Sequence, residues 1–483
     1  MFLQKIYSSE GMSRKLNIKG EIPNTSSLYK GFLKMAWPAM IESMLMSLVN
    51  MVDTMMVSSC GTAAVSAVGL TTQPRMIFYS VFFALNIAVT AIVSRRKGQE
   101  DKEGANACLM QSLGLVAVLA VVLCGFAVLN ADFLIKLSGA NDETLADATV
   151  YFQITMVGLI FTSFGMIING AQRGSGNTKI SMRTNVVANV TNVVFNALLI
   201  NGVVLGGVTI FPELGVKGAA IATLIGNIAS FVMSLSSLFA KGKFLSFSFV
   251  GMLKWKLPLL KTIGKVALGA GTEQIFMRVG FLLYSIIVAN LGTAEFATHT
   301  ICMSIITLSF AGGDGLSVAA SALIGQNLGK QREDLAALYA KAGQRVGLLV
   351  SAVLMLLFTF CGGFVLELFA NPDDVNYSYV MDVGRNLTYI IAIVSPGQIS
   401  QVIYNGALRG AGDTKFVAVT SAISIGIFRP LVAFLLCNPN GIIPFITGIG
   451  IYGAWISLLI DQYLRLAFSA WRFSSGKWAK INI

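Results

Sequence analysis

The sequence predicts an all-α polytopic membrane protein, with twelve transmembrane helices in two pseudo-symmetric six-helix bundles. Its composition, its long apolar runs and an internal repeat all lead to this fold class. Of the 483 residues, 55% are hydrophobic and only 12% are charged. Soluble domains carry about 25% charged residues. So few charges could not cover the surface of a soluble fold of this size.

Twelve apolar runs are long enough to cross a bilayer, which takes about 20 residues in a helix. They lie at 33–57, 70–94, 106–129, 149–168, 186–206, 216–239, 264–290, 300–326, 344–369, 385–407, 416–436 and 449–471. Each run should be a helix, because an open strand edge cannot satisfy its backbone in lipid. The runs are continuous rather than alternating, which argues against a transmembrane β-barrel.

The second half of the chain repeats the first. Residues 169–179 (NGAQRGSGNTK) match residues 405–415 (NGALRGAGDTK) at eight of eleven positions. Residues 215–226 match residues 450–461 at six of twelve positions. Six helices in each copy is an even number, so the copies have the same orientation and form parallel repeats.

The basic residues indicate the topology. With the N-terminus inside, 29 of the 35 Lys and Arg residues fall on the inner side, three on the outer side and three within the spans. By the positive-inside rule, both termini are therefore expected in the cytoplasm, with the chain in the inner or plasma membrane. The net charge of +12 follows from this asymmetry and requires no nucleic-acid partner.

The predicted organisation has five parts. They are a cytoplasmic N-terminal segment at 1–32, an N-lobe with helices 1–6 at 33–240, a cytoplasmic linker at 241–263, a C-lobe with helices 7–12 at 264–473, and a cytoplasmic tail at 474–483. Two parallel six-helix lobes suit a V-shaped, alternating-access transporter with its substrate path between the lobes. We expect a monomer.

Several segments resemble the multidrug and toxic compound extrusion (MATE) family. They are AWPA at 36–39, VNMVDT at 49–54, ASALIGQNLG at 320–329 and the two NGAxRGxGxTK segments. These segments fall in both halves, so the resemblance covers nearly the whole chain. It implies a secondary active multidrug efflux antiporter, which exports amphipathic, often cationic organic compounds in exchange for inward Na⁺ or H⁺. It implies no cofactor besides that coupling ion.

Ionisable residues inside a bilayer are costly, and they mark functional or paired sites. The spans contain Glu42, Asp53, Arg75, Glu273, Arg278, Asp314, Arg429 and Asp461. Glu42 and Asp53 are eleven residues apart, so they share one helix face at a separation of roughly 16 Å. Glu273 is the repeat mate of Glu42, whereas Tyr284 takes the position that corresponds to Asp53. This asymmetry places ion coupling in the N-lobe.

The resemblance assigns roles to particular N-lobe residues. Asp53 matches the helix 1 aspartate of the DinF-like and NorM-like branches, and Pro38 stands where the DinF-like branch has its bending proline. Asn192 and Asn196 stand where that branch has Asn-x-x-x-Asp, so an amide replaces one carboxylate. Thr223 matches a further helix 6 ligand. Their oxygens beside one carboxylate suit a hard cation such as Na⁺, whereas a proton needs Asp53 alone.

The C-lobe shows mixed features. Glu273 resembles the helix 7 glutamate of NorM-like members, and Gln398 falls at or near their helix 10 aspartate. The cation-coupling candidates are therefore Asp53, Asn192, Asn196, Thr223 and Glu273. The substrate-cavity candidates are Glu42, Glu273, Tyr284, Gln398 and Asp314. No metal is expected beyond a Na⁺ ion at Asp53.

Other charged residues are predicted to be structural. Arg429 is expected to pair with an acid across the bundle, and Asp461 and Arg465 have the spacing of an intrahelical pair. Arg173 and Arg409 are interpreted as organising the turns after helices 4 and 10. Asp314 lies in Gly-Gly-Asp-Gly, which fits either a loosened helix beside a cavity or close helix packing.

Three other functions are alternatives to the antiporter. A lipid-linked oligosaccharide flippase of the same architecture would need several cationic residues lining its cavity, and only three Arg lie in the spans. An exporter of one dedicated metabolite stays open. An intramembrane enzyme is not expected, because the sequence shows no nucleophile–base arrangement.

Overall fold

The computed structural model describes residues 7–14, 16–58, 60, 62–140, 142–200, 202–205, 208–239, 242–368, 377–438 and 448–481. The chain divides into two compact units. We call residues 41–267 the N-unit, and residues 1–40 together with 268–483 the C-unit. The predicted boundaries of the lobes, linker and tail stay predictions.

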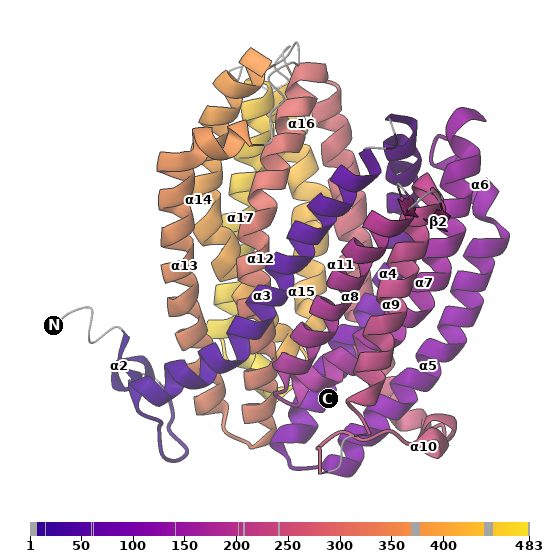
Figure 1. The fold of residues 1–483 in the computed structure, drawn as a ribbon. Helices are drawn as coiled ribbons and strands as arrows, with labels where there is room; N and C mark the ends of the chain where they lie inside the picture. Colours follow the sequence, from indigo (N-terminus) through magenta and orange to yellow (C-terminus); the bar gives the residue numbers. More distant parts are fainter. Residues whose placement is uncertain are drawn as a thin grey trace. The chain divides into compact units, whose positions relative to one another are not determined.

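The N-unit is built from helices and one short hairpin (Figure 1). Its elements are the later part of α3 (Thr25–Ser58), α4 (Thr62–Gly98), α5 (Lys102–Leu129), α6 (Ala131–Leu137), α7 (Asp142–Gly174), α8 (Thr178–Leu199), β1 (Val203–Leu205), β2 (Val208–Phe211), α9 (Gly215–Ser236) and α10 (Phe249–Leu253). α7 packs against both α4 and α9, and α8 packs against α9.

The secondary structure of the C-unit consists of helices in its described residues. Its elements are α2 (Ser9–Ser13), the first part of α3, most of α11 (Leu257–Ala289), α12 (Thr293–Gly329), α13 (Glu333–Glu367), α14 (Tyr377–Gly410), α15 (Thr414–Ile423), the π-helix η1 (Ser424–Phe428), α16 (Arg429–Cys437), α17 (Ile451–Ser474) and the 3₁₀ helix η2 (Lys477–Lys480). α14 lies at the centre of this unit, in contact with α12, α13 and α17.

Twelve helices account for the predicted spans. Among the described residues, ten stretches are long and apolar enough to cross a membrane, with α15, η1 and α16 counted as one. The other two predicted spans correspond to α8 and α17, which have 22 and 24 residues. Both are long enough to span but carry more polar side chains. In α8 these are asparagines at 185, 189, 192 and 196, whose spacing puts them along one face.

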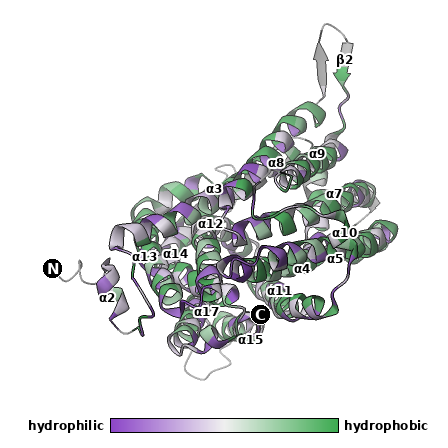
Figure 2. Ribbon diagram, turned by 90° about the horizontal axis from the view of Figure 1, so that it is seen from below, coloured by the Kyte–Doolittle hydropathy of each residue, from purple (hydrophilic) through white to green (hydrophobic). Residues whose placement is uncertain are grey.

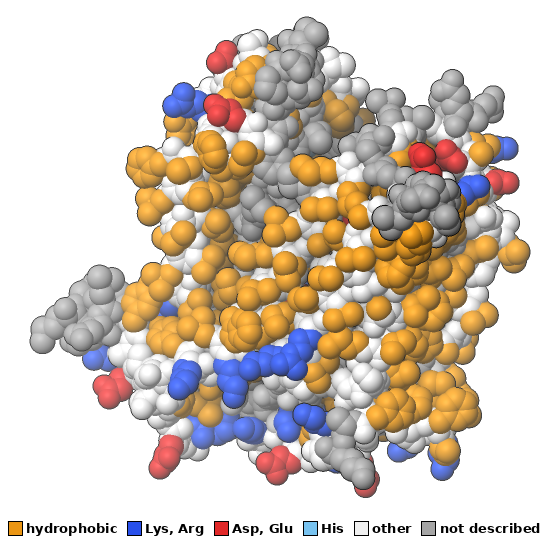
Figure 3. Space-filling model, in the orientation of Figure 1, with side chains coloured by type: hydrophobic (Ala, Val, Ile, Leu, Met, Phe, Trp, Pro, Cys, Tyr) orange, Lys and Arg blue, Asp and Glu red, His pale blue; other side chains and the backbone are white. Residues whose placement is uncertain are grey.

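Apolar side chains cover the outside of the helices. Figure 2 shows hydrophobic residues along most of the helices, and Figure 3 shows hydrophobic side chains over much of the visible face. The side chains of Leu129 and Phe360 are 86% and 79% exposed. Such exposure is costly in water but suits contact with lipid. The prediction of an all-α polytopic membrane protein is confirmed.

Three local features were not predicted from the sequence. A short antiparallel hairpin joins α8 to α9, pairing Val203 with Phe211. A short helix, α10, lies within the predicted linker. The eleventh span contains the π-turn η1 directly before Pro430. Proline has no N–H, and its ring crowds the carbonyl four residues earlier, so a widened turn accommodates it there.

The structure bears on two sequence predictions about helix geometry, one at Pro38 and one at the Gly-Gly-Asp-Gly segment. Pro38 lies inside α3, which continues from Thr25 to Ser58, and the bend expected there stays a prediction. The Gly-Gly-Asp-Gly segment lies inside the continuous helix α12. A Cβ on Gly315 would collide with the backbone of Met40 in the same unit. Close helix packing therefore explains the glycine at 315.

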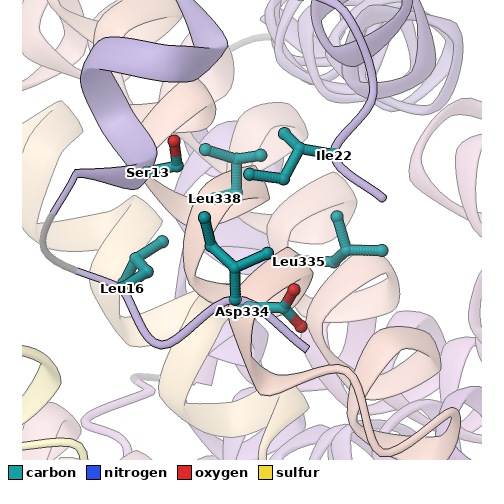
Figure 4. Close-up of a pocket in the computed structure, with 7 residues that line it drawn as sticks. Ser13, Leu16, Ile22, Asp334, Leu335 and Leu338 are labelled. Carbon is teal, nitrogen blue, oxygen red and sulfur yellow. The ribbon is translucent and has the colours of Figure 1, made fainter. Parts of the chain in front are cut away.

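The N-terminal residues pack onto the start of α13 within the C-unit. The side chains of Leu16, Ile22, Leu335 and Leu338 face one another around a small pocket (Figure 4). The Asp334 carboxylate accepts a hydrogen bond from the Lys19 backbone N–H at 3.2 Å. It also accepts one from the Arg332 guanidinium at 2.8 Å, and the same Arg332 nitrogen donates to the Glu21 carbonyl. Charge and apolar contact together fix this segment to the unit.

Candidate functional site

Four of the predicted coupling residues meet within the N-unit. Asn196 Nδ2 on α8 donates to Asp53 Oδ1 on α3 at 2.7 Å. Asn192 lies one turn earlier on the same face of α8, within 3.1 Å of Thr223 Oγ1 on α9. Asn192 and Asn196 are 6% and 1% exposed, and Asp53 is half-buried. Residues 143 positions apart thus form one polar cluster inside a membrane-spanning unit.

A glycine lets α8 and α9 approach closely beside this cluster. A Cβ on Gly226 would lie 2.8 Å from the Ala188 carbonyl oxygen and 3.2 Å from Asn192 Cβ. Thr223, three residues before Gly226, is therefore held beside Asn192. Its hydroxyl also donates to the Ala219 carbonyl at 3.0 Å, so its remaining lone pair faces the asparagine.

The hydrogen-bond partners of Asn192 fix the orientation of its amide. The nitrogen donates to Asp53 Oδ1 at 2.7 Å, and the oxygen accepts from the Thr223 backbone N–H at 3.3 Å. The opposite orientation would place the amide oxygen against the Asp53 carboxylate, where two acceptors repel. Asp53 therefore accepts hydrogen bonds from the amides of both Asn192 and Asn196.

The cluster has the donor set that a hard monovalent cation requires. The Asp53 carboxylate, the two amide oxygens and the Thr223 hydroxyl supply only oxygen ligands, which such cations prefer. Asn196 Oδ1 is buried, and it has no hydrogen-bond partner among the described residues. Within the described part of the chain, no Lys or Arg forms an ion pair with Asp53. The charge of Arg75 acts on Asp53 from beyond ion-pair distance.

Glu42 lies elsewhere in the N-unit and is bound to an arginine. Its Oε1 accepts from Arg173 Nη1 at 3.2 Å, from Asn185 Nδ2 at 2.7 Å and from Ser181 Oγ at 3.0 Å. Arg173 also donates to Asn86 Oδ1 at 3.2 Å. The sequence predicted that Arg173 organises the turn after helix 4. It did not predict the pairing of Arg173 with Glu42.

Glu273 has the matching arrangement in the C-unit. Its Oε1 accepts a short hydrogen bond from Arg409 Nη2 and a longer one from Ser421 Oγ at 3.3 Å. The Glu273 side chain is 2% exposed. The signal that could have revealed both pairs was present in the sequence, because both copies of the repeat keep the glutamate and the arginine.

A second buried cluster in the C-unit is centred on Asp461. Its Oδ2 accepts from Arg429 and from Arg465, the latter at 3.0 Å, and its Oδ1 accepts from Ser424 in the π-turn η1. Asp461 is fully buried, and Arg429 is 2% exposed. The predicted pairing of Arg429 with an acid across the bundle and the predicted intrahelical pair are both confirmed.

Of the remaining cavity candidates, Tyr284 lies beside the Asp461 cluster, with Arg429 Cζ 5.8 Å from the centre of its ring. The Tyr284 hydroxyl donates to the Ala454 carbonyl at 2.8 Å, and its ring packs edge-on against His299. Gln398 is fully buried on α14, and its amide has no partner among the described residues. Asp314 is exposed on α12. Their contact with substrate stays a prediction.

The described residues contain no group of three or more His, Cys, Asp and Glu that could hold a metal ion. The polar chemistry of both units instead consists of single acids among amides, hydroxyls and arginines. The described residues thus form a membrane-embedded, tandem-repeat helical protein in which acids lie inside both units.

Comparison with known proteins defines the family. The MatE family model matches the chain twice, at residues 38–198 and again at 270–435. The chain belongs to the MatE family. The two matches coincide with the two copies of the internal repeat, and they confirm the resemblance found in the sequence motifs.

Relatives of similar length support the same assignment. A probable multidrug resistance protein NorM from Thermotoga maritima is 26% identical over 466 residues, 96% of this chain and 95% of the relative. An uncharacterized transporter, YisQ, from Bacillus subtilis is 26% identical over 459 residues, 94% and 96% of the two chains. A crystal structure of MATE in complex with MaL6 has a TM-score of 0.84 at 20% identity, covering 93% of this chain and 97% of that chain.

Proposed function

We propose that this protein is a secondary active multidrug efflux antiporter, exporting amphipathic, often cationic organic compounds in exchange for inward Na⁺ or H⁺. The observation that carries the proposal is Asp53, an acid within a membrane-spanning unit that accepts from the Asn196 amide and forms no ion pair among the described residues. A charge in the membrane interior costs at least about 2.5 kcal/mol. The acid is maintained because it binds the coupling ion.

The relatives support the substrate class. Several are named multidrug resistance proteins, among them NorM of Thermotoga maritima and MdtK of Edwardsiella ictaluri. Substrates of this kind share an apolar body and often a positive charge, so they would compete with the coupling ion for acidic groups. The protein would work as a monomer in the cytoplasmic membrane, with both termini in the cytoplasm.

Asp53, Asn192, Asn196 and Thr223 would hold the ion. Binding neutralises the Asp53 carboxylate and so weakens the hydrogen bonds that the Asn192 and Asn196 amides donate to it. This local change would bias the equilibrium between two conformations of the transporter. An ion shifts such an equilibrium only by its difference in affinity for the two states.

The charge pattern argues against a lipid-linked oligosaccharide flippase. A flippase would need free cationic side chains for a pyrophosphate. Arg173, Arg409, Arg429 and Arg465 are each engaged with a buried acid. These arginines are occupied in holding helices together.

The test is efflux from proteoliposomes loaded with ethidium, an amphipathic cation. An inward Na⁺ gradient and an inward H⁺ gradient are imposed in separate experiments, with equal ion concentrations on both sides as the control. We expect one gradient to accelerate efflux roughly 5- to 150-fold, the usual range of coupling between two sites. The gradient that succeeds identifies the ion. Efflux that responds to neither gradient contradicts the antiporter.

A further inference from the structure

Both repeats contain the same buried ion pair between helices far apart in the sequence. In the N-unit it joins Glu42 on α3 to Arg173 on α7 at 3.2 Å. In the C-unit it joins Glu273 on α11 to Arg409 on α14. The glutamates are 231 residues apart and the arginines 236, which are the offsets of the repeat itself. The pairs therefore correspond to each other.

The third members of the two clusters correspond as well. Asn185 on α8 donates to Glu42, and Ser421 on α15 donates to Glu273. These two positions are also 236 residues apart. Each cluster therefore ties the first helix of its repeat to the fourth and the fifth. Three helices meet at one carboxylate oxygen in each unit.

The glutamates occupy a particular place in the chain. α3 passes from the C-unit to the N-unit between Met40 and Ile41, and Glu42 follows at once. α11 passes from the N-unit to the C-unit between Ala267 and Leu268, and Glu273 follows within two turns. Each helix that crosses between units is thus bound to the unit it enters, close to the point of entry.

The environment of the pairs makes them strong links. The Glu42 and Arg173 side chains are 10% and 14% exposed, and those of Glu273 and Arg409 are 2% and 21% exposed. Salt bridges on the surface contribute little. Removing one partner of a buried pair is strongly destabilising, because an uncompensated charge stays behind. Both members are therefore required together.

We propose that Glu42–Arg173 and Glu273–Arg409 are matched clamps that fix each crossing helix to the unit it enters, with the two arginines as positioning residues. Their part in transport rests on the function proposed above, whereas their part in folding does not. Glu273 was also predicted to exchange the coupling ion. The two roles make opposite predictions for a variant in which Glu273 and Arg409 are both replaced by neutral residues. If Glu273 exchanges the ion, this variant loses coupling; if Glu273 only pairs with Arg409, no buried charge is left and the variant keeps coupling.

The test is a double-mutant cycle with Glu273→Gln, Arg409→Gln and the combined variant. Thermal unfolding of the purified protein and gradient-driven ethidium efflux are measured for each. We expect each single change to lower Tm by about 5–10 °C and to reduce the maximal efflux rate with little change in KM. The combined variant should recover at least half of the lost Tm and keep its response to the gradient. Arg409→Lys should keep more Tm than Arg409→Gln, because the charge remains.

Matched controls come from the same protein. Arg96 and Asp101 form an ion pair at 3.0 Å whose side chains are 36% and 34% exposed. Arg96→Gln and Asp101→Asn should change Tm by no more than about 2 °C and should act additively. The cycle of Glu42→Gln and Arg173→Gln repeats the test in the N-unit, and it decides the matter if the combined C-unit variant does not fold.

Two results would overturn the clamps. If the single variants have the Tm and the efflux rate of the wild type, the ion pairs do not fix the crossing helices. A combined variant that is as stable as the wild type but no longer responds to the gradient would show that Glu273 itself exchanges the ion. If wild-type efflux responds to no gradient, the proposed function fails, while the Tm cycle still decides whether the clamps exist.

Discussion

Asp53→Asn is expected to abolish ion-coupled efflux while the protein stays folded. Asparagine has nearly the same shape as aspartate, and its side-chain oxygen can still accept from Asn196 Nδ2, which lies 2.7 Å from Asp53 Oδ1. The substitution removes the carboxylate that takes up a proton or attracts a cation. Efflux in an ion gradient should fall to the rate without a gradient, a loss of roughly 5- to 150-fold.

The measurement compares gradient-driven ethidium efflux from proteoliposomes that contain equal amounts of each variant. Asp132→Asn is the matched control, because Asp132 is an exposed aspartate on α6 of the same unit. This control should transport as the wild type does. Normal coupling in Asp53→Asn would remove Asp53 from the mechanism.

Asp461→Asn is expected to be the most destabilising of the conservative substitutions. Asp461 forms the ion pairs of both Arg429 and Arg465, and all three side chains are buried. Its neutralisation would remove the ion-pair partner of two guanidinium groups. Breaking a buried ion pair costs about 3–5 kcal/mol. The bond that anchors Ser424 of the π-turn would weaken as well.

Thermal unfolding of the purified protein checks this expectation. Tm should fall by about 10 °C or more. The control is Asp382→Asn, an exposed aspartate on α14 of the same unit, which should leave Tm within about 2 °C. An unchanged Tm in Asp461→Asn would mean that the cluster contributes little to the C-unit.

The sequence predicted the fold well because membrane insertion leaves a simple signal. Long apolar runs had to be helices, and the matched NGAxRGxGxTK segments showed the duplication that the two MatE matches confirm. The resemblance to the family's Asn-x-x-x-Asp motif grouped Asn192 with Asn196, and their spacing of four places them on one helix face. The pattern is recognisable although α8 has low hydropathy, because the polar residues share a single face.

Local spacing in the sequence did not identify the partner of each charge. Glu42 and Arg173 are 131 residues apart, and Glu273 and Arg409 are 136 apart. No local spacing relates such residues, because helix packing alone decides which side chains meet. Arg173 and Arg409 were therefore read as turn residues. The π-turn at Ser424–Phe428 was missed for a related reason, since it depends on how the following Arg429-Pro430 is accommodated.

Coupling between the transport of the ion and the transport of the exported compound is reciprocal. If an inward ion gradient drives efflux, an outward substrate gradient must drive ion uptake. The most direct measurement loads wild-type proteoliposomes with ethidium, leaves Na⁺ and H⁺ at equal concentrations on both sides, and follows radioactive Na⁺ uptake and internal pH. We predict uptake of one ion that stops when ethidium is equal on both sides and is lost in Asp53→Asn. Ethidium leaving without the uptake of either ion would contradict the claim.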